Sequence, residues 1–180
     1  MKKKLYAAYG SNLNIRQMAY RCPGAKLIGA GVIPGYKLQF KGQRNGAFAT
    51  ISPKEGAEVP VAVWSITQRD ELSLDRYEGF PSHYFKQDVP VRMDGRELSV
   101  MAYIMDLRMD FGVPTPWYYE TVAEGYQDCG LDESYLKNAL KMSLQNVPPG
   151  FFRQEYQDEV EPEDEPLEEQ EEPGFSMQLM

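Results

Sequence analysis

The stretch that decides the fold is Leu5–Leu13, which reads Leu-Tyr-Ala-Ala-Tyr-Gly-Ser-Asn-Leu. Its first half is short and apolar, as expected for a β-strand, and it breaks at a Gly-Ser-Asn turn. A helical pattern follows at once, with Ile15, Met18 and Ala19 at the i, i+3, i+4 spacing of a buried helix face. The chain is therefore predicted to run from a strand through a glycine turn into a helix.

This turn is also a candidate binding site. A strand that enters a helix through a glycine turn leaves several backbone N–H groups unpaired and directed at one point. That point favours an anion, or a carbonyl oxygen that gains negative charge. Gly10 lets the backbone approach a ligand, and Ser11, Asn12 and Asn14 can cap the helix or contact the ligand. An ordinary strand-to-helix turn without a ligand explains the same pattern.

The distribution of charge divides the chain. Its 180 residues favour a single domain with a full core. The formal net charge of −8 comes from one end, because residues 154–180 hold 11 acidic residues and no Lys or Arg, whereas residues 1–153 hold 19 basic and 16 acidic ones. The nearly neutral part has no basic stripe for nucleic acid. We predict a domain over residues 1–153 and an acidic tail over residues 154–180 that is disordered, because it holds little apolar surface.

The cysteines and the N-terminus bear on location. Cys22 and Cys129 lie far apart without metal-ligand spacing, so we interpret them as buried thiols of a reducing compartment. The apolar run after Lys2–Lys4 is too short for a signal peptide. No stretch approaches the length of a transmembrane helix. A cytoplasmic protein that binds no membrane is the expectation.

The middle of the chain predicts hairpins and the end predicts helices. Asn45-Gly46 and Asp94-Gly95 are typical of tight hairpin turns. The expected strands are Tyr36–Phe40, Ala47–Ile51, Val59–Ile66, Phe85–Met93 and Leu98–Ile104. A short helix is expected from the cap Thr67, paired with Asp70, to the stop Gly79. Two later helices are expected, one from Thr115-Pro116 to Gly130 with Tyr118, Val122 and Tyr126 on one face, and one from Asp132 to Pro148 with Leu136, Leu140 and Leu144 as its apolar stripe.

Few side chains can carry chemistry. His83 is the only histidine, so triad schemes and histidine-rich metal sites have almost nothing to build on, and a surface or loop position is expected for it. Glu78 falls in the last turn of the short helix, where the helix dipole opposes a negative charge. Small and apolar neighbours favour its partial burial, and both effects raise a carboxyl pKa toward the range of a general acid/base. An exposed glutamate without a role is the alternative, and many glutamates at helix ends are of this kind.

Three motifs in order resemble the gamma-glutamylcyclotransferase family. They are Tyr9–Leu13, then Leu74–Gly79 (Leu-Asp-Arg-Tyr-Glu-Gly) followed by Tyr84, then Pro114–Tyr118 before a helix that ends at Gly130-Leu131. The resemblance covers about residues 4–146. Two departures are Thr115 in place of the usual serine, and Val61 where the family often has glycine, which is expected to narrow the floor of the pocket.

The resemblance implies an α+β fold, with a small, mixed, barrel-like β-sheet and flanking helices. It implies that Glu78 is the general acid/base, and that a γ-glutamyl group is held by Tyr6, Ala7, Ala8, Tyr9, Gly10, Ser11, Asn12 and Tyr118. The implied reaction is the attack of a γ-glutamyl amide's own α-amino group on its γ-carbonyl, which forms 5-oxoproline and releases an amine without metal or cofactor. The partner is then a small γ-glutamyl molecule. Two alternatives stay open: a non-catalytic binding module on the same scaffold, and the same chemistry on a biosynthetic intermediate or a protein lysine.

Overall fold

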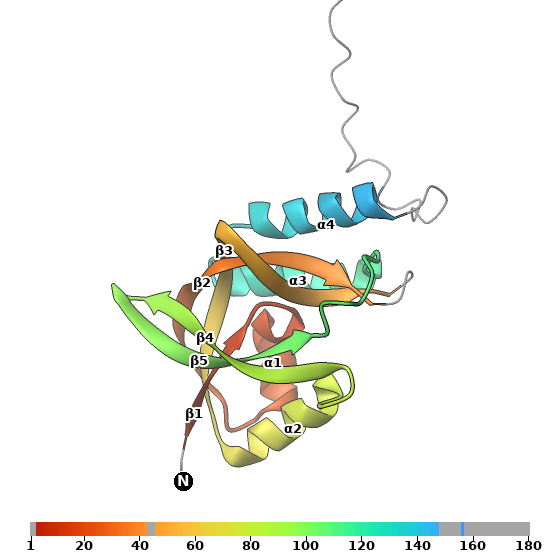
Figure 1. Ribbon diagram of the computed structural model, residues 1–180. Helices are drawn as coiled ribbons and strands as arrows, with labels where there is room; N and C mark the ends of the chain where they lie inside the picture. The colour runs from red at the N-terminus through yellow and green to blue at the C-terminus, as the bar shows by residue number, and fades with distance from the viewer. Residues whose placement is uncertain (1–2, 43–45, 148–155, 157–180) are drawn as a thin grey trace, which may run out of the picture.

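The computed structural model describes residues 3–42, 46–147 and 156. In chain order its elements are β1 (Lys4–Ala8), the short 3-10 helix η1 (Ser11–Leu13), α1 (Ile15–Arg21), β2 (Lys26–Lys41), β3 (Phe48–Ile66), α2 (Gln68–Glu78), β4 (Tyr84–Met93), β5 (Arg96–Met105), α3 (Pro116–Asp128) and α4 (Ser134–Asn146). Strand, turn and helix follow one another at the N-terminus as the opening stretch predicts (Figure 1).

The five strands close into a barrel in the order β1-β3-β2-β4-β5. Neighbours pair antiparallel except β1 and β5, which meet in parallel at Tyr6 and Met101. The sheet is therefore mixed. Helix α2 lies at the bottom of Figure 1 with α1 just above it, whereas α4 crosses the upper end of the barrel. The predicted α+β fold with a small barrel-like sheet and flanking helices is confirmed.

Strands β2 and β3 are much longer than the sequence predicted. The predicted segments Tyr36–Phe40 and Ala47–Ile51 do lie on two antiparallel paired strands, but each is one end of a much longer strand. Strand β3 begins at Phe48, one residue later than predicted, and also contains Val59–Ile66. Between Ala47–Ile51 and Val59–Ile66, residues 53–56 have the sequence Pro-Lys-Glu-Gly, which is typical of a loop. They are accommodated by an irregularity in the register opposite Gly35, where both glycines adopt positive φ. The expectation of two separate strands was wrong for this reason.

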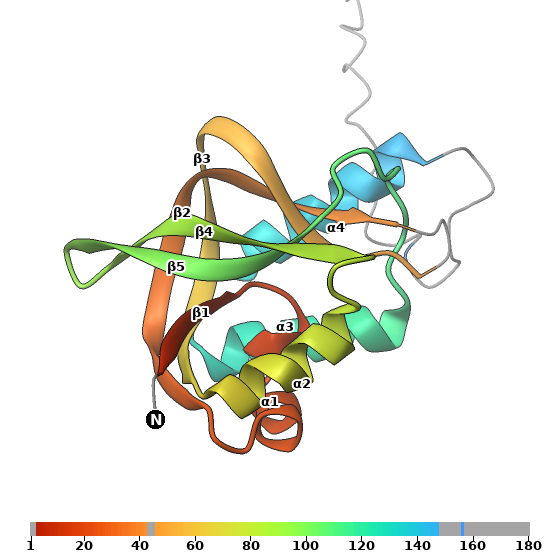
Figure 2. The same cartoon turned by 60° about the horizontal axis from the view of Figure 1, so that its bottom comes forward.

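The β4–β5 hairpin follows the prediction closely. Met93 pairs with Arg96 across a turn in which Asp94 and Gly95 both have positive φ, at 52° and 72°. This is the backbone that favours Asp-Gly. The hairpin projects from the barrel, as Figure 2 shows at the left.

Local capping signals located α2 and α3 correctly. Thr67 and Asp70 form a reciprocal capping box at the start of α2, and Gly79 ends it in the left-handed conformation with φ of 65°. Thr115 caps α3 through the Tyr118 N–H, with Pro116 as the first helical residue. These two helices carry Glu78 and Tyr118 into the site described below.

Two helix predictions need correction. In α1 only Met18 is buried, whereas Ile15 and Ala19 are exposed. The helix has seven residues, and its neighbours cover one residue of the predicted face. The last helix begins at Ser134 and not at Asp132, whose carboxylate instead accepts a hydrogen bond from the Ser134 N–H.

The core joins the barrel to α3 and α4. Gly125 of α3 lies so close to η1 that an added Cβ would stand 2.6 Å from the Asn14 nitrogen and the Leu13 Cβ.

Beyond residue 147 the structure describes only Tyr156, which is buried and packs edge-on against Tyr119 with ring centroids 5.9 Å apart. The other residues of the predicted tail lie outside the described part, so the domain boundary and the tail's disorder stay predictions. In the part of the chain that is described, no helix is long and apolar enough to cross a membrane.

Candidate active site

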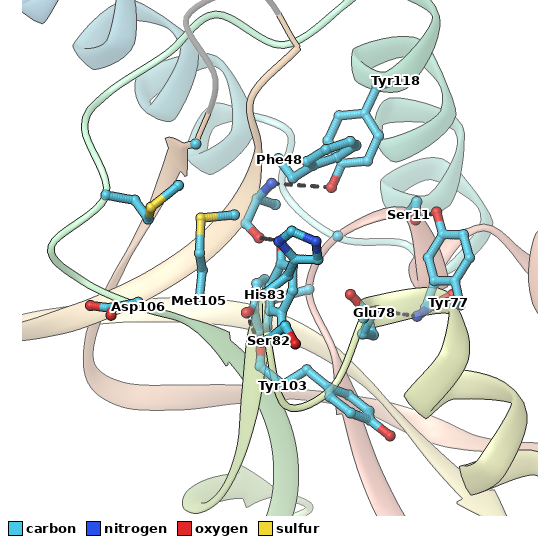
Figure 3. A pocket seen from close by; sticks show the side chains of 18 of the residues that line it. Ser11, Phe48, Tyr77, Glu78, Ser82, His83, Tyr103, Met105, Asp106 and Tyr118 are labelled. Atoms are coloured by element: carbon cyan, nitrogen blue, oxygen red, sulfur yellow. Dashed lines mark hydrogen bonds between the residues drawn. The ribbon is translucent and has the colours of Figure 1, made fainter.

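A cavity of about 920 Å³ opens beside the N-terminal loop (Figure 3). Its walls come from the loop after β1, the end of α2, the start of β3, the end of β5 and Tyr118 of α3. Of the residues implied by the family resemblance, Tyr6, Tyr9, Gly10, Ser11, Asn12, Glu78 and Tyr118 all line it. Ala7 and Ala8 are buried in β1 and are not among the lining residues.

Glu78 lies at the centre of this arrangement, as the last residue of α2 before the left-handed Gly79. Its Oε1 accepts a hydrogen bond of 3.0 Å from the Asn12 side-chain amide. Burial raises the pKa of its carboxyl from an ordinary value of 4.5 to about 7, against the lowering effects of Arg21 and of the Asn12 hydrogen bond. The position at the end of a helix and the raised pKa agree with the interpretation from the sequence.

The glycine turn forms the wall beside Glu78. Gly10 precedes η1, and its carbonyl accepts from the Leu13 N–H at 3.0 Å. A Cβ on Gly10 would stand 3.1 Å from the Tyr118 hydroxyl and 3.3 Å from the Ala49 Cβ. The turn therefore needs glycine because of close approach, and this keeps its backbone at the cavity surface.

Two tyrosines hold the opposite wall through one peptide unit. The Tyr118 hydroxyl accepts from the Ala49 N–H at 3.1 Å, and the Tyr84 hydroxyl donates to the Ala49 carbonyl at 2.8 Å. Tyr118 also packs edge-on against Phe48, with ring centroids 5.0 Å apart. Because the Tyr118 hydroxyl accepts from Ala49, its own proton stays available for a ligand. Burial raises the pKa of Tyr118 and of Tyr84 well above that of free tyrosine, so both stay protonated near pH 7.

Sequence reasoning missed parts of the site that come from distant segments. Tyr103 of β5 lines the cavity, packs edge-on against Tyr6, and donates a 2.5 Å hydrogen bond to Asp75 of α2. Lys86 pairs with the same Asp75 at 2.8 Å. This network links the barrel wall to the helix that carries Glu78. The signal available for Tyr103 was its place in an apolar strand, which reads equally well as core.

Other expectations can be compared with the geometry. His83 is an exposed loop residue, as predicted, and it stands at the mouth of the cavity. Val61 is fully buried and does not line the cavity, so it does not narrow the floor as expected. Within residues 3–42, 46–147 and 156, no group of three or more His, Cys, Asp or Glu is placed to hold a metal ion. The polar groups gathered here can hold a small molecule and exchange a proton with it.

Comparison with known proteins places this site in a family. A family model described as "Gamma-glutamyl cyclotransferase, AIG2-like" matches residues 6–120, which include the loop, Glu78 and Tyr118. The chain belongs to this family.

Individual proteins and a solved structure that resemble this chain carry the same name. A Bos taurus protein named gamma-glutamylcyclotransferase is 28% identical over 169 residues, which cover 87% of this chain and 85% of that protein. A Mus musculus protein of the same name is 29% identical over 166 residues, with the same coverage. A solved structure named gamma-glutamyl cyclotransferase superimposes with a TM-score of 0.70 at 27% identity, covering 87% of this chain and 97% of that one. The likeness thus extends over nearly the whole described part of the chain.

Proposed function

We propose that this protein is a gamma-glutamylcyclotransferase that converts a γ-glutamyl amide into 5-oxoproline and a free amine. The observation that supports this most strongly is the pairing of Glu78 with the glycine turn across one cavity. The carboxyl has a pKa of about 7 because it is buried. Family membership supports the same reaction class.

The reaction is intramolecular. The α-amino nitrogen of the substrate attacks its own γ-carbonyl carbon, the new C–N bond closes a five-membered lactam, and the amide C–N bond to the leaving amine breaks. The site must hold the substrate in its folded-back conformer, which replaces a bimolecular encounter by positioning. The cavity of about 920 Å³ has room for a γ-glutamyl group together with a leaving amine.

Glu78 performs the proton transfers in this proposal. As a carboxylate it takes a proton from the substrate's α-ammonium, which frees the amine to attack, and as a carboxylic acid it returns this proton to the leaving nitrogen. The second proton that the attacking nitrogen loses when the lactam forms also passes to the released amine, which leaves as an ammonium. A pKa near 7 populates both forms at neutral pH, which is the condition for one group to serve in both steps. The net reaction consumes no water and no proton.

The glycine turn supplies the electrostatic part. Gly10 and Ser11 line the cavity together with Glu78, and in this proposal their backbone N–H groups bind either the oxyanion of the tetrahedral intermediate or the substrate's α-carboxylate. The Tyr118 proton is a third donor beside them. Fixed donors in a site that excludes bulk water stabilise developing charge more than water does.

The test is to incubate the purified protein with a panel of γ-glutamyl amino acids, γ-glutamyl amines and γ-glutamyl-ε-lysine, and to measure 5-oxoproline by mass spectrometry. We expect turnover of at least one member. Glu78→Gln keeps the side chain's shape but cannot exchange a proton, so it should lower kcat by roughly 10²–10⁴-fold.

Glu120→Gln, on the exposed face of α3, is the matched control and should leave kcat unchanged. An active Glu78→Gln enzyme would refute the assignment of Glu78. No turnover of any compound, together with tight binding of one, would instead favour a non-catalytic binding module.

We also infer a cytoplasmic location, since Cys22 and Cys129 are free thiols. Cell fractionation tests this, and recovery from an oxidising compartment would contradict it.

A further inference from the structure

Arg21 forms an unusual set of contacts just outside the cavity. It is the last residue of α1, and it is not among the residues that line the cavity. Its Nη1 donates to Asn12 Oδ1 at 2.7 Å and to Ser11 Oγ at 3.2 Å, and its Nη2 donates to Gln17 Oε1 at 2.8 Å. The planar guanidinium is therefore held from three sides.

The same guanidinium covers Tyr77, the residue before Glu78. Its central carbon lies 3.6 Å from the centroid of the Tyr77 ring, a close cation–π contact. The Tyr77 hydroxyl shares a 3.0 Å hydrogen bond with Ser11 Oγ, and Figure 3 shows these two residues side by side next to Glu78. Arg21 thus connects the glycine turn to the end of α2, two segments more than 60 residues apart.

The contact with Asn12 decides which side of its amide faces Glu78. An arginine only donates, so the Asn12 atom that it contacts must be the carbonyl oxygen. The Asn12 NH₂ group then points the other way and donates to Glu78 Oε1 at 3.0 Å and to the Tyr6 hydroxyl at 2.9 Å. Asn12 is 2% exposed, so no water competes for either face. A reversed amide would present its carbonyl oxygen to Glu78, and only a protonated Glu78 carboxyl could donate a hydrogen bond to that oxygen.

We propose that Arg21 is a positioning residue of the cyclotransferase reaction, which holds the Asn12 amide with its NH₂ turned toward Glu78 and locks the glycine turn to the end of α2. This inference rests on the proposed function only for its effect on turnover. The effect of Arg21 on the ionisation of Glu78 can be measured without any turnover. Arg21 acts through Asn12 and Tyr77 and touches no reacting atom.

The charges around Glu78 indicate what losing Arg21 would do. The groups that face Glu78 from neighbouring elements are Arg21 of α1, Tyr6 of β1, Tyr9 of the loop, Tyr84 of β4, Tyr103 of β5 and Tyr118 of α3. Arg76, Tyr77, His83 and Asp106 line the same cavity. Burial raises the pKa of all five facing tyrosines, so they stay neutral, and Arg21 and the Asn12 NH₂ are what oppose the effect of burial on the Glu78 carboxyl. Removing Arg21 therefore raises the pKa of Glu78 further.

The test titrates Glu78 directly. The ¹³Cδ resonance of Glu78, assigned by its loss in Glu78→Gln, is followed from pH 4 to 10 in the wild type and in Arg21→Met, which keeps an apolar chain over Tyr77 but no charge. We expect the midpoint to rise by about one pH unit in Arg21→Met. The acid limb of the kcat/KM profile should move by the same amount, and kcat/KM at pH 7 should fall about fivefold, because the ionised fraction of Glu78 falls by that factor.

Two further variants make the outcome specific. Arg16→Met is the matched control, an exposed arginine on the same helix, and its midpoint should match the wild type. Arg21→Lys keeps the charge but cannot donate to three residues in one plane, so it should give a smaller upward movement, and it covers the case in which Arg21→Met fails to fold. Because histidine changes charge between pH 5 and 8, each titration is repeated in a His83→Gln background.

The outcomes separate the two proposals. The role of Arg21 is overturned if the titration midpoint of Glu78 in Arg21→Met equals that of the wild type. If only Arg21→Lys folds, the same comparison is made with that variant. A role confined to stability would lower the melting temperature and leave the midpoint in place, which also overturns it. Absence of 5-oxoproline from the wild type overturns the proposed function, whereas the titration still reports on Arg21.

Discussion

Glu78→Gln should stabilise the protein relative to the wild type, by an amount that grows as the pH rises from about 4.5 to about 7 and then levels off. In the unfolded chain Glu78 releases its proton near pH 4.5, whereas in the folded protein burial holds the proton to about pH 7. Between these values the folded state binds more protons than the unfolded state. The free energy of unfolding therefore falls as the pH rises through this interval. Below pH 4.5 Glu78 is protonated in both states and costs nothing.

The magnitude follows from the width of that interval. Each pH unit between the two pKa values is worth about 1.36 kcal/mol, and the carboxyl keeps some contact with water in the cavity, which lowers the total. We therefore expect wild type to lose roughly 2–3 kcal/mol of stability through Glu78 between pH 4.5 and pH 8. A glutamine has no proton to release, and its Oε1 can still accept from the Asn12 amide.

The assay is urea unfolding of both proteins at pH 4.5, 6, 7, 8 and 9. Other titrating groups contribute equally to the two proteins, so the difference in unfolding free energy isolates Glu78. It should grow by roughly 2–3 kcal/mol in favour of Glu78→Gln and level off above pH 8. A difference that stays constant over the whole range would refute the claim that Glu78 is a buried carboxyl with a raised pKa.

Three further changes test the walls of the site and the end of the domain. Gly10→Val, whose added atoms meet the Tyr118 hydroxyl, should abolish turnover, whereas Ser11→Ala should cost less than tenfold in kcat/KM; the reverse order would contradict binding through the backbone of the turn. Gly125→Ala should lower the free energy of unfolding by about 1–3 kcal/mol and should also lower turnover, because the added Cβ meets η1. Melting followed by circular dichroism and a 5-oxoproline assay measure the two effects, and unchanged stability and turnover would contradict the tight contact. A chain ending after residue 157 should melt like the full chain, whereas one ending at Arg153 should lose roughly 1.5–3 kcal/mol with the buried Tyr156; equal melting would contradict that packing.

Local chemistry explains which parts of the fold the sequence predicted. The Thr67–Asp70 capping box and the left-handed Gly79 place α2 to the residue, since both depend on contacts within a few positions. The Asp94-Gly95 turn sets the register of its hairpin in the same way. The sequence did not predict the irregularity opposite Gly35, because a polar stretch within a strand has the composition of a loop and only its pairing partner shows that the strand continues.

The residues of the site also differ in whether a local sequence signal identifies them. Glu78 was found from its position at a helix end, and the turn at Gly10 from its glycine, because both signals are local. Arg21 gave no signal, since a basic residue at the end of a helix is ordinary. Its contacts with Asn12 and Tyr77 arise only when α1 packs beside the end of α2. An ionisable residue that acts through other side chains can be recognised only from the folded structure.

The central claim is that Glu78 drives an intramolecular cyclisation and not a hydrolysis, and a product analysis in H₂¹⁸O tests it most directly. The protein is incubated in labelled water with the γ-glutamyl compound that it turns over, and the released amine, 5-oxoproline and glutamate are measured by mass spectrometry. Cyclisation predicts one unlabelled 5-oxoproline for each amine released, because the lactam carbonyl keeps the oxygen of the substrate. Glutamate carrying one ¹⁸O in its γ-carboxylate would contradict the account, since it would show that water, and not the substrate's own amine, attacks the γ-carbonyl.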